Sequence, residues 1–163
     1  MPGIQKGDDV RWKNGIQQDG AAAWGGSIAS VGTELDFIGA ETIESHVKDQ
    51  LQMDLAKGDS ALTVRFLGKS LLRNPGEFMT PLLLRALADA AVEKKRLVMD
   101  FRGLSYMNSS TLTPVIKILE RARQSGGKIS VQYRKSVKWQ EISFSALIIF
   151  ETQDQRITIE GWG

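Results

Sequence analysis

The sequence feature that most constrains the fold is a short, nearly continuous apolar run at residues 97–101. A run of this length is typical of a central strand that is covered on both faces of a sheet. Segments whose apolar residues recur with helical spacing stand on either side of it, and segments with strand-like alternation lie beyond them. Strands that alternate with helices in this way predict an α/β fold.

Two strand-like segments precede the first helical segment. Residues 50–55 and 62–67 each alternate polar and apolar side chains, and turn-forming residues separate them. This pattern predicts a β-hairpin. A rival interpretation is a helix over residues 41–55, in which apolar residues recur every four positions: Ile43, Val47, Leu51 and Leu55.

The helix before the apolar run is expected to begin at Asn74. Asn74 precedes Pro75 and stands three residues before Glu77, which is the pattern of an N-cap, an N1 proline and a capping box. Thr80-Pro81 is an alternative start. The expected buried face consists of Phe78, Leu82, Leu83, Ala86, Leu87 and Ala90.

The helix after the apolar run is expected to start around residues 108–110. It should stop at Gly126-Gly127, where a left-handed C-terminal cap fits. Pro114 would kink this helix if it stood beyond the first turn. The apolar stripe comprises Leu112, Val115, Ile116, Leu119 and Ala122.

Three further elements complete the pattern: a strand at 128–133, a shorter helix within 141–153 and an edge strand at 156–160. The shorter helix is expected to make its apolar contacts through Ile142, Leu147, Ile148 and Phe150. With right-handed crossovers, the order predicts an α/β sandwich in which a mixed sheet of about five strands packs against helices.

Charge and glycine content divide the chain near residue 45. Residues 1–45 carry a formal charge of −4 and half of the 16 glycines, whereas residues 46–163 carry +6. Because glycine raises the entropy lost on ordering, residues 1–45 are expected to form a flexible or loosely docked leader, and residues 46–163 the folded domain. The best anchors for the leader are Trp12, Trp24 and Phe37.

Composition excludes several classes of site. The chain has no cysteine, so it forms no disulfide, zinc–thiolate site or cysteine nucleophile, and its single histidine, His46, excludes a multi-histidine metal site. We therefore expect no metal and no cofactor. The first residues lack the basic and apolar regions of a signal peptide, and no apolar run approaches the ~20 residues of a membrane helix. A cytoplasmic protein without membrane contact is expected.

The sequence contains no complete motif associated with catalysis. Gly68-Lys69-Ser70 copies the end of a P-loop, but Thr63 stands where that motif requires a glycine. His46 is interpreted as an incidental polar residue, and the chain has neither a nucleophile elbow nor a zincin motif. The basic residues are scattered over several elements, which favours a solvated surface over a nucleic-acid site. We expect a protein that is not an enzyme.

The segment that follows the apolar run delivers three consecutive hydroxyl groups to a helix start: Ser109, Ser110 and Thr111. Backbone N–H groups lack intrahelical partners there, and the end of the helix dipole is positive. Two interpretations follow. A hydroxyl can cap the helix, or it can accept a phosphate whose charge the helix end partly offsets.

The central part of the chain resembles the STAS domain, the fold of bacterial anti-sigma-factor antagonists. The matching pieces are the strand at 97–101, the signature at 104–110, the helix end at 124–128 and the strand at 129–133. The likeness extends more weakly over residues 50–160, and residues 139–144 look like a cyanobacterial-type STAS-like regulator subgroup. The leader has no counterpart in the family.

The resemblance implies a non-enzymatic phosphoprotein that acts in signal transduction by partner switching. Carried over by position, the phosphorylated residue is Ser109, with Ser110 and Thr111 as second choices. The partner-binding residues are Met107, Asn108, Ser109, Ser110 and Thr111. Common antagonists have Asp at the position of Asn108 and glycine at that of Thr111, but a STAS-like family that regulates a diguanylate cyclase also has Asn before its phosphorylated hydroxyl.

The implied partners are a GHKL-type serine kinase of the anti-sigma type and a PP2C-type phosphatase. The regulated system would be a sigma factor or a diguanylate cyclase. The alternative is a STAS-like module that binds a ligand or scaffold without phosphorylation, in which Ser109 is only a helix cap.

Overall fold

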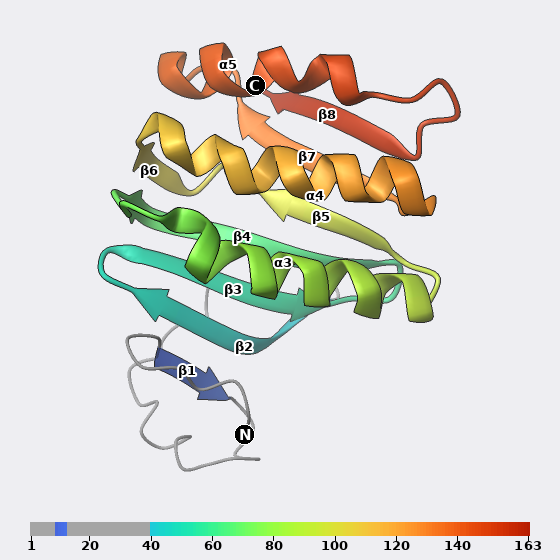
Figure 1. Cartoon of the computed structure of the whole chain (residues 1–163), viewed down its shortest axis with the longest axis horizontal. Helices are drawn as coiled ribbons and strands as arrows, with labels where there is room; N and C mark the ends of the chain where they lie inside the picture. Colours follow the sequence, from blue (N-terminus) through green and yellow to red (C-terminus); the bar gives the residue numbers. More distant parts are fainter. Residues whose placement is uncertain (1–8, 13–39) are drawn as a thin grey trace.

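A computed structural model of the chain describes residues 9–12 and 40–163, which form a mixed sheet and three α-helices (Figure 1). The strands are β1 (Asp9–Trp12), β2 (Glu41–Lys48), β3 (Leu51–Lys57), β4 (Ala61–Ser70), β5 (Arg96–Asp100), β6 (Leu104–Met107), β7 (Ile129–Arg134) and β8 (Ile157–Trp162). The helices are α3 (Pro75–Val92), α4 (Leu112–Ser125) and α5 (Lys138–Ser145), with the 3₁₀ turns η2 (Ser109–Thr111) and η3 (Ala146–Phe150).

The sheet has the order β1-β2-β3-β4-β5-β7-β8, and the short strand β6 pairs with β4 beside this path. The pairs from β1 to β4 are antiparallel, and the pairs β4–β5, β5–β7 and β7–β8 are parallel. The predicted mixed α/β architecture is confirmed. The sheet has eight strands rather than about five, because β1, β2 and β6 were not foreseen.

The predicted hairpin is confirmed as β3 and β4, with Leu51 opposite Gly68 and Lys57 opposite Leu62. The rival helix over residues 41–55 is wrong. A four-residue spacing of apolar side chains is a multiple of the two-residue strand period, so it fits one face of a strand as well as one face of a helix. The turn between β2 and β3, where Asp49 has a φ of 54°, divides the two strands.

Helix α3 begins at the predicted position, with Asn74 as N-cap and Pro75 in the first turn, but the Asn74 side chain makes no capping hydrogen bond. The alternative start at Thr80-Pro81 is wrong, since Pro81 lies inside the helix. Helix α4 starts at Leu112, because the predicted start forms the 3₁₀ turn η2 instead. Pro114 is therefore in the first turn of α4, and Gly126 has the predicted left-handed conformation with a φ of 79°.

The last helical segment departs further from the sequence prediction. It begins at Lys138 and continues as the 3₁₀ turn η3. Leu147 is buried as expected, but Ile142 is 63% exposed and Ile148 49% exposed. The short, irregular helix turns these side chains to the surface, which apolar character alone could not indicate. β8 lies at the end of the sheet order and is the predicted edge strand.

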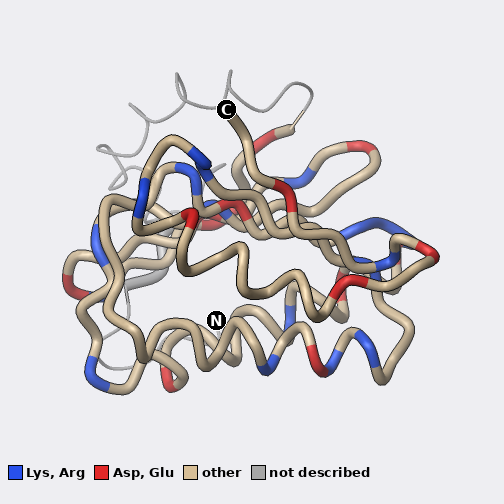
Figure 2. Tube along the Cα trace, turned by 90° about the horizontal axis from the view of Figure 1, so that it is seen from above, with Lys and Arg blue, Asp and Glu red and all other residues tan. Residues whose placement is uncertain are grey.

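Helices α3, α4 and α5 pack on the same face of the sheet (Figures 1 and 2). The sequence analysis expected the apolar run, now β5, to be covered on both faces, and the helices of the described residues cover one of them. On the other face β5 carries the buried Asp100, which binds Arg102 through two of its guanidinium nitrogens.

A stack of aromatic rings joins the sheet to α5. The Phe66 and Phe101 rings lie 4.1 Å apart by centroid with planes 12° apart, and the Phe101 and Phe144 rings lie 4.5 Å apart. All three side chains are fully buried. Phe101 is the first residue after β5, so the stack fixes the point where the chain leaves the centre of the sheet for β6.

We predict that Phe101→Ala destabilises the fold by about 3–5 kcal/mol, because it leaves a cavity between two aromatic rings. Ile149→Ala is the control, since Ile149 is 77% exposed, and it should change stability by less than about 0.5 kcal/mol. Urea denaturation followed by circular dichroism measures both. Equal effects of the two substitutions would contradict the assignment of Phe101 to the core.

β2 carries the chain across residue 45, so residues 41–45 belong to the sheet. β1 pairs with it antiparallel, with Asp9 opposite Val47 and Trp12 opposite Glu44. Trp24 and Phe37, the other expected anchors of the leader, lie outside the described residues. The helices of the described part of the chain are too short or too polar to cross a membrane.

His46 is buried on β2 and contacts Glu44 of the same strand, which also pairs with the partly exposed Arg85. Its Nε2 lies 2.6 Å from Oε1 of Glu44, and the Arg85 guanidinium on α3 also donates to that oxygen. Burial alone would raise the pKa of Glu44, but the hydrogen bond with His46 and the charge of Arg85 outweigh it, so that the pKa is lowered. Glu44 thus joins β2 to α3, and His46, which the sequence analysis interpreted as an incidental polar residue, is a buried partner of Glu44 on the same strand.

This ionic group makes stability depend on pH. A carboxyl whose pKa is lower in the folded state stabilises the fold above its unfolded-state pKa, and this stabilisation is lost as the pH falls through the folded-state pKa. We predict that Glu44→Gln costs about 1–3 kcal/mol near neutral pH and that the difference from wild type shrinks below about pH 4.5. Urea denaturation over a pH series tests this. Glu41→Gln, at an exposed position of the same strand, should have little effect at any pH, and a Glu44→Gln difference independent of pH would contradict the prediction.

Candidate functional site

The three predicted hydroxyls lie at the end of β4, where β6 is held in parallel with it. Leu104 pairs with Gly68, Tyr106 with Lys69 and Met107 with Ser70. The backbone N–H of Asn108 then donates to the Ser70 carbonyl oxygen at 3.0 Å. The chain that leaves β5 therefore runs along the end of β4 as β6, and η2 begins beside the last residue of β4.

The end of β4 has an irregular backbone at Gly68 that a residue with a side chain could not adopt without strain. The φ of Gly68 is 83°, and a Cβ at this position would lie 2.1 Å from the Gln50 carbonyl oxygen. The pairing register with β6 shifts between Gly68 and Lys69. The resemblance of Gly68-Lys69-Ser70 to the end of a P-loop is therefore a consequence of a strand irregularity, and the three residues belong to β4.

Two residues at the start of α5 hold the loop between β5 and β6. The fully buried Gln140 side chain donates to the Phe101 and Leu104 carbonyl oxygens and accepts from the Arg134 backbone N–H at 2.7 Å. Trp139 donates from Nε1 to the Ser105 carbonyl oxygen at 3.2 Å. The sequence motif at 139–144 supported the family resemblance, but its role in positioning the site was missed.

Asn108 organises two of the three hydroxyls. Its Oδ1 accepts from Ser110 Oγ at 2.9 Å and from Thr111 Oγ1 at 2.8 Å, while its Nδ2 donates to the Leu72 carbonyl oxygen at 3.1 Å. Thr111 is 1% exposed and also lies 2.7 Å from the buried Ser70 hydroxyl. Because Thr111 gives its proton to Asn108, Ser70 is the donor in that contact.

Ser109 differs from its two neighbours. Its side chain is exposed, and its hydroxyl makes no hydrogen bond to any other described residue. Neither Asn108 nor Thr111, the residues at the N-cap positions of η2 and α4, makes a side-chain capping hydrogen bond. Within the described part of the chain, the hydroxyl of Ser109 thus makes no hydrogen bond that caps the helix.

The remaining predicted residues contribute differently. Met107 is 6% exposed and faces the core, whereas Tyr106 beside it is 46% exposed. Leu71, which follows Ser70 at the end of β4, is 49% exposed. The sequence analysis placed Met107 among the partner-binding residues and did not include Tyr106 or Leu71, which the structure exposes beside it. The burial of β6 is not a two-residue alternation, because the pairing with β4 shifts between Leu104 and Tyr106, so that Ser105 and Tyr106 are both exposed and Leu104 and Met107 both buried. Alternation in the sequence therefore could not indicate which side chains face out.

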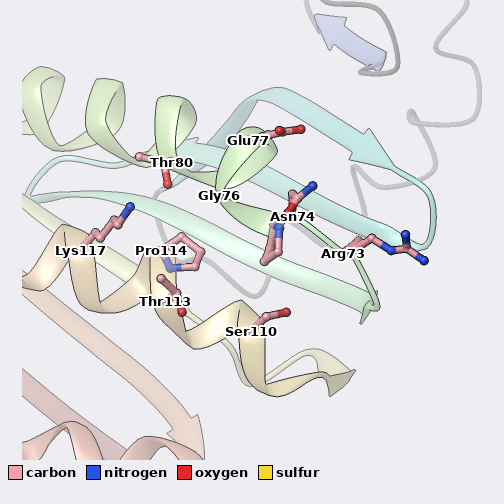
Figure 3. A pocket seen from close by; sticks show the side chains of 10 residues that line it. Arg73, Asn74, Gly76, Glu77, Thr80, Ser110, Thr113, Pro114 and Lys117 are labelled. Atoms are coloured by element: carbon pink, nitrogen blue, oxygen red, sulfur yellow. The ribbon is translucent and has the colours of Figure 1, made fainter.

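A groove of about 520 Å³ adjoins the hydroxyls, between the N-terminal ends of α3 and α4 (Figure 3). Ser110 and Thr113 line one side of it and Thr80 the other, and Arg73 and Lys117 lie at its margins (Figure 3). Glu77 also lines the groove, so its charge is mixed. The lining therefore combines hydroxyl groups and charges of both signs with the apolar surface of Pro75 and Pro114.

The fold and this site define an α/β protein with a mixed sheet, helices on one face and an exposed serine at a helix start. Within residues 9–12 and 40–163, no three His, Cys, Asp or Glu side chains gather so that they could hold a metal ion.

The chain was compared with protein-family models, curated proteins and solved structures. No family model and no curated protein matches it. Among solved structures it is similar to a chain in the complex of the diguanylate cyclase SiaD with its activator SiaC from Pseudomonas aeruginosa, at 22% identity and a TM-score of 0.45, covering 70% of this chain and 95% of that one. It is also similar to SiaC of Pseudomonas aeruginosa, at 23% identity and a TM-score of 0.41, covering 66% of this chain and 90% of that one. Likeness at this level does not identify the function of this chain.

The hydrogen bonds of the site predict that two adjacent substitutions differ in their effect on the stability of the fold. Asn108→Ala removes one hydrogen bond each from the Leu72 carbonyl oxygen, Ser110 and Thr111, and should cost about 1–3 kcal/mol of stability. Ser109→Ala should change stability by less than about 0.5 kcal/mol. Thermal and urea denaturation of both variants measure the effects, and a loss with Ser109→Ala as large as that with Asn108→Ala would show that Ser109 is structural.

Proposed function

We propose that this chain is a non-enzymatic, STAS-like regulatory protein in which reversible phosphorylation of Ser109 controls binding to a partner. The observation that carries the proposal is the contrast among three adjacent hydroxyls. Ser109 is exposed and makes no hydrogen bond to a described residue, whereas both neighbours donate to Asn108. The resemblance of residues 97–133 to the STAS domain supports the same residue.

The geometry makes Ser110 and Thr111 less suitable acceptors. A kinase must place the hydroxyl in line with the γ-phosphoryl group of ATP, so the oxygen has to be accessible. Thr111 is 1% exposed and would require η2 to unfold. Ser110 is partly buried and would lose its hydrogen bond to Asn108. Transfer to Ser109 breaks no hydrogen bond with a described residue.

A phosphate on Ser109 would change the surface without unfolding the domain. It adds about −1.5 to −2 charges at neutral pH, and the positive end of the η2–α4 helical segment offsets part of that charge. Tyr106 and Leu71 expose apolar surface at the same end of β4 and β6. A partner seated on this surface would have to desolvate the phosphate, so phosphorylation should release it.

The partners follow from the family resemblance. A GHKL-type kinase of the anti-sigma type would phosphorylate Ser109, and a PP2C-type phosphatase would remove the phosphate. The regulated partner would belong to a sigma-factor system or be a diguanylate cyclase. Asn108 favours the cyclase, since a STAS-like family that regulates such an enzyme also has Asn before its phosphorylated hydroxyl.

A second candidate function rests on the groove beside Ser110. Its hydroxyls and the cations Arg73 and Lys117 would suit an anionic ligand, and the chain would then be a ligand-binding STAS-like module without phosphorylation. In that case Arg73→Ala and Lys117→Ala would abolish regulation, while Ser109→Ala would leave it intact.

The switch predicts opposite partner binding for two variants at one position. In native cells, tagged Ser109→Ala should retain a partner that Ser109→Asp loses by about tenfold or more, because a carboxylate imitates part of the phosphate charge. Quantitative mass spectrometry of the co-purified proteins measures the ratio. Ser105→Asp, at an exposed serine on β6, controls for added charge as such. Equal recovery with both Ser109 variants would show that Ser109 does not control binding.

A further inference from the structure

A second groove, of about 530 Å³, lies between the C-terminal halves of α3 and α4. The groove beside Ser110 is lined by residues 73–80 and 110–117, whereas this one is lined by residues 84–95 and 121–128. The two grooves therefore occupy opposite ends of the same pair of helices. A segment bound in this second groove would therefore leave Ser109 uncovered.

The groove has an apolar lining supplied mainly by α3. Leu84, Leu87 and Ala91 lie on one stripe of the helix, and Leu84 is 39% exposed. Leu87 is buried, and its Cδ1 lies 3.1 Å from where a Cβ on Gly127 would be. The absence of a side chain at Gly127 therefore keeps the groove open beside Leu87.

Cations surround this apolar lining. Lys94 and Lys95 follow the end of α3, Arg121 lies on α4, and Lys128 precedes β7. Lys95 is already engaged, since it donates to the Gly58 carbonyl oxygen and pairs with Glu93 at 3.0 Å. Lys94, Arg121 and Lys128 form no ion pair with another described residue. Three cations are thus available beside exposed apolar surface.

Stabilisation of the helix ends does not account for this arrangement. Cations that offset a helix dipole act within the last turn. The last turn of α3 contains no basic residue, and that of α4 contains Arg123, which does not line the groove. A second copy of this chain is also a poor occupant, because symmetric docking would bring the same cations face to face.

We propose that this groove binds an acidic, amphipathic helical segment of a partner protein. Apolar side chains one helical turn apart would lie on Leu84, Leu87 and Ala91, and carboxylates on the flanks of the helix would meet Lys94, Arg121 and Lys128. Apolar contact supplies the affinity, and the cations select for an acidic segment over a basic one. The proposal does not depend on phosphorylation of Ser109.

The test is selection of a display library of random 16-residue peptides on the full-length protein. The expected result is enrichment of acidic peptides with apolar residues at i, i+3 or i+4, and i+7. Their affinity should fall by about tenfold or more in the Arg121→Glu/Lys128→Glu variant and by a similar factor on adding salt. Arg123→Glu/Lys138→Glu is the matched control, because it makes the same charge change at two exposed positions outside the groove.

Several results would overturn the proposal. These are the absence of enriched peptides, enrichment of basic peptides, or equal binding by the Arg121→Glu/Lys128→Glu variant.

Two further results would identify a different occupant of the groove. A concentration-dependent dimer that this double substitution abolishes would identify a second copy as the occupant. A gain in peptide binding when Glu34 and Asp36 are both replaced by Lys in the full chain would assign the groove to the acidic leader, residues 1–45. A folded Leu84→Asp variant that still binds the peptides would exclude the apolar contact.

Discussion

The hydrogen bonds of Asn108 are the interaction on which the candidate site depends. Through its backbone N–H and its amide group, this one residue joins the end of β4, the chain leading to α3 and the turn η2. Because Oδ1 of Asn108 accepts from both Ser110 and Thr111, two hydroxyls face inward and Ser109 is left outside. The exposure of Ser109 is thus a consequence of how its neighbours are bound.

The rest of the fold holds Asn108 in place. The parallel pairing of β6 with β4 brings the segment to the correct end of the sheet, and Gly68 permits the irregular backbone that this pairing needs. Gln140 binds the loop that leads into β6, and the stack of Phe66, Phe101 and Phe144 fixes where that loop begins. Contacts between residues 35 or more positions apart in sequence therefore set the geometry at Ser109.

Much of the architecture could be predicted from the sequence, because strand and helix periods are local properties of the chain. The hairpin of β3 and β4, helices α3 and α4 and the edge strand β8 were anticipated in this way. β6 was missed since four residues carry too short an alternation, and β2 was masked by a spacing that strands and helices share. The position of Ser109 was predicted from the resemblance, but its difference from Ser110 and Thr111 depends on Asn108 side-chain bonds that no periodicity encodes. The exposure of Tyr106 and the burial of Met107 likewise follow from the pairing of β6.

The central claim is that Ser109 is a phosphorylation site. The most direct measurement is the intact mass of the protein purified from its native cells, followed by mapping of the modified residue in wild type and in Ser109→Ala. The account predicts a fraction of the wild-type protein that carries one phosphoryl group on Ser109, and none in the variant. Absence of this modification under every growth condition, or its location on Ser110 in the wild type, would contradict the account.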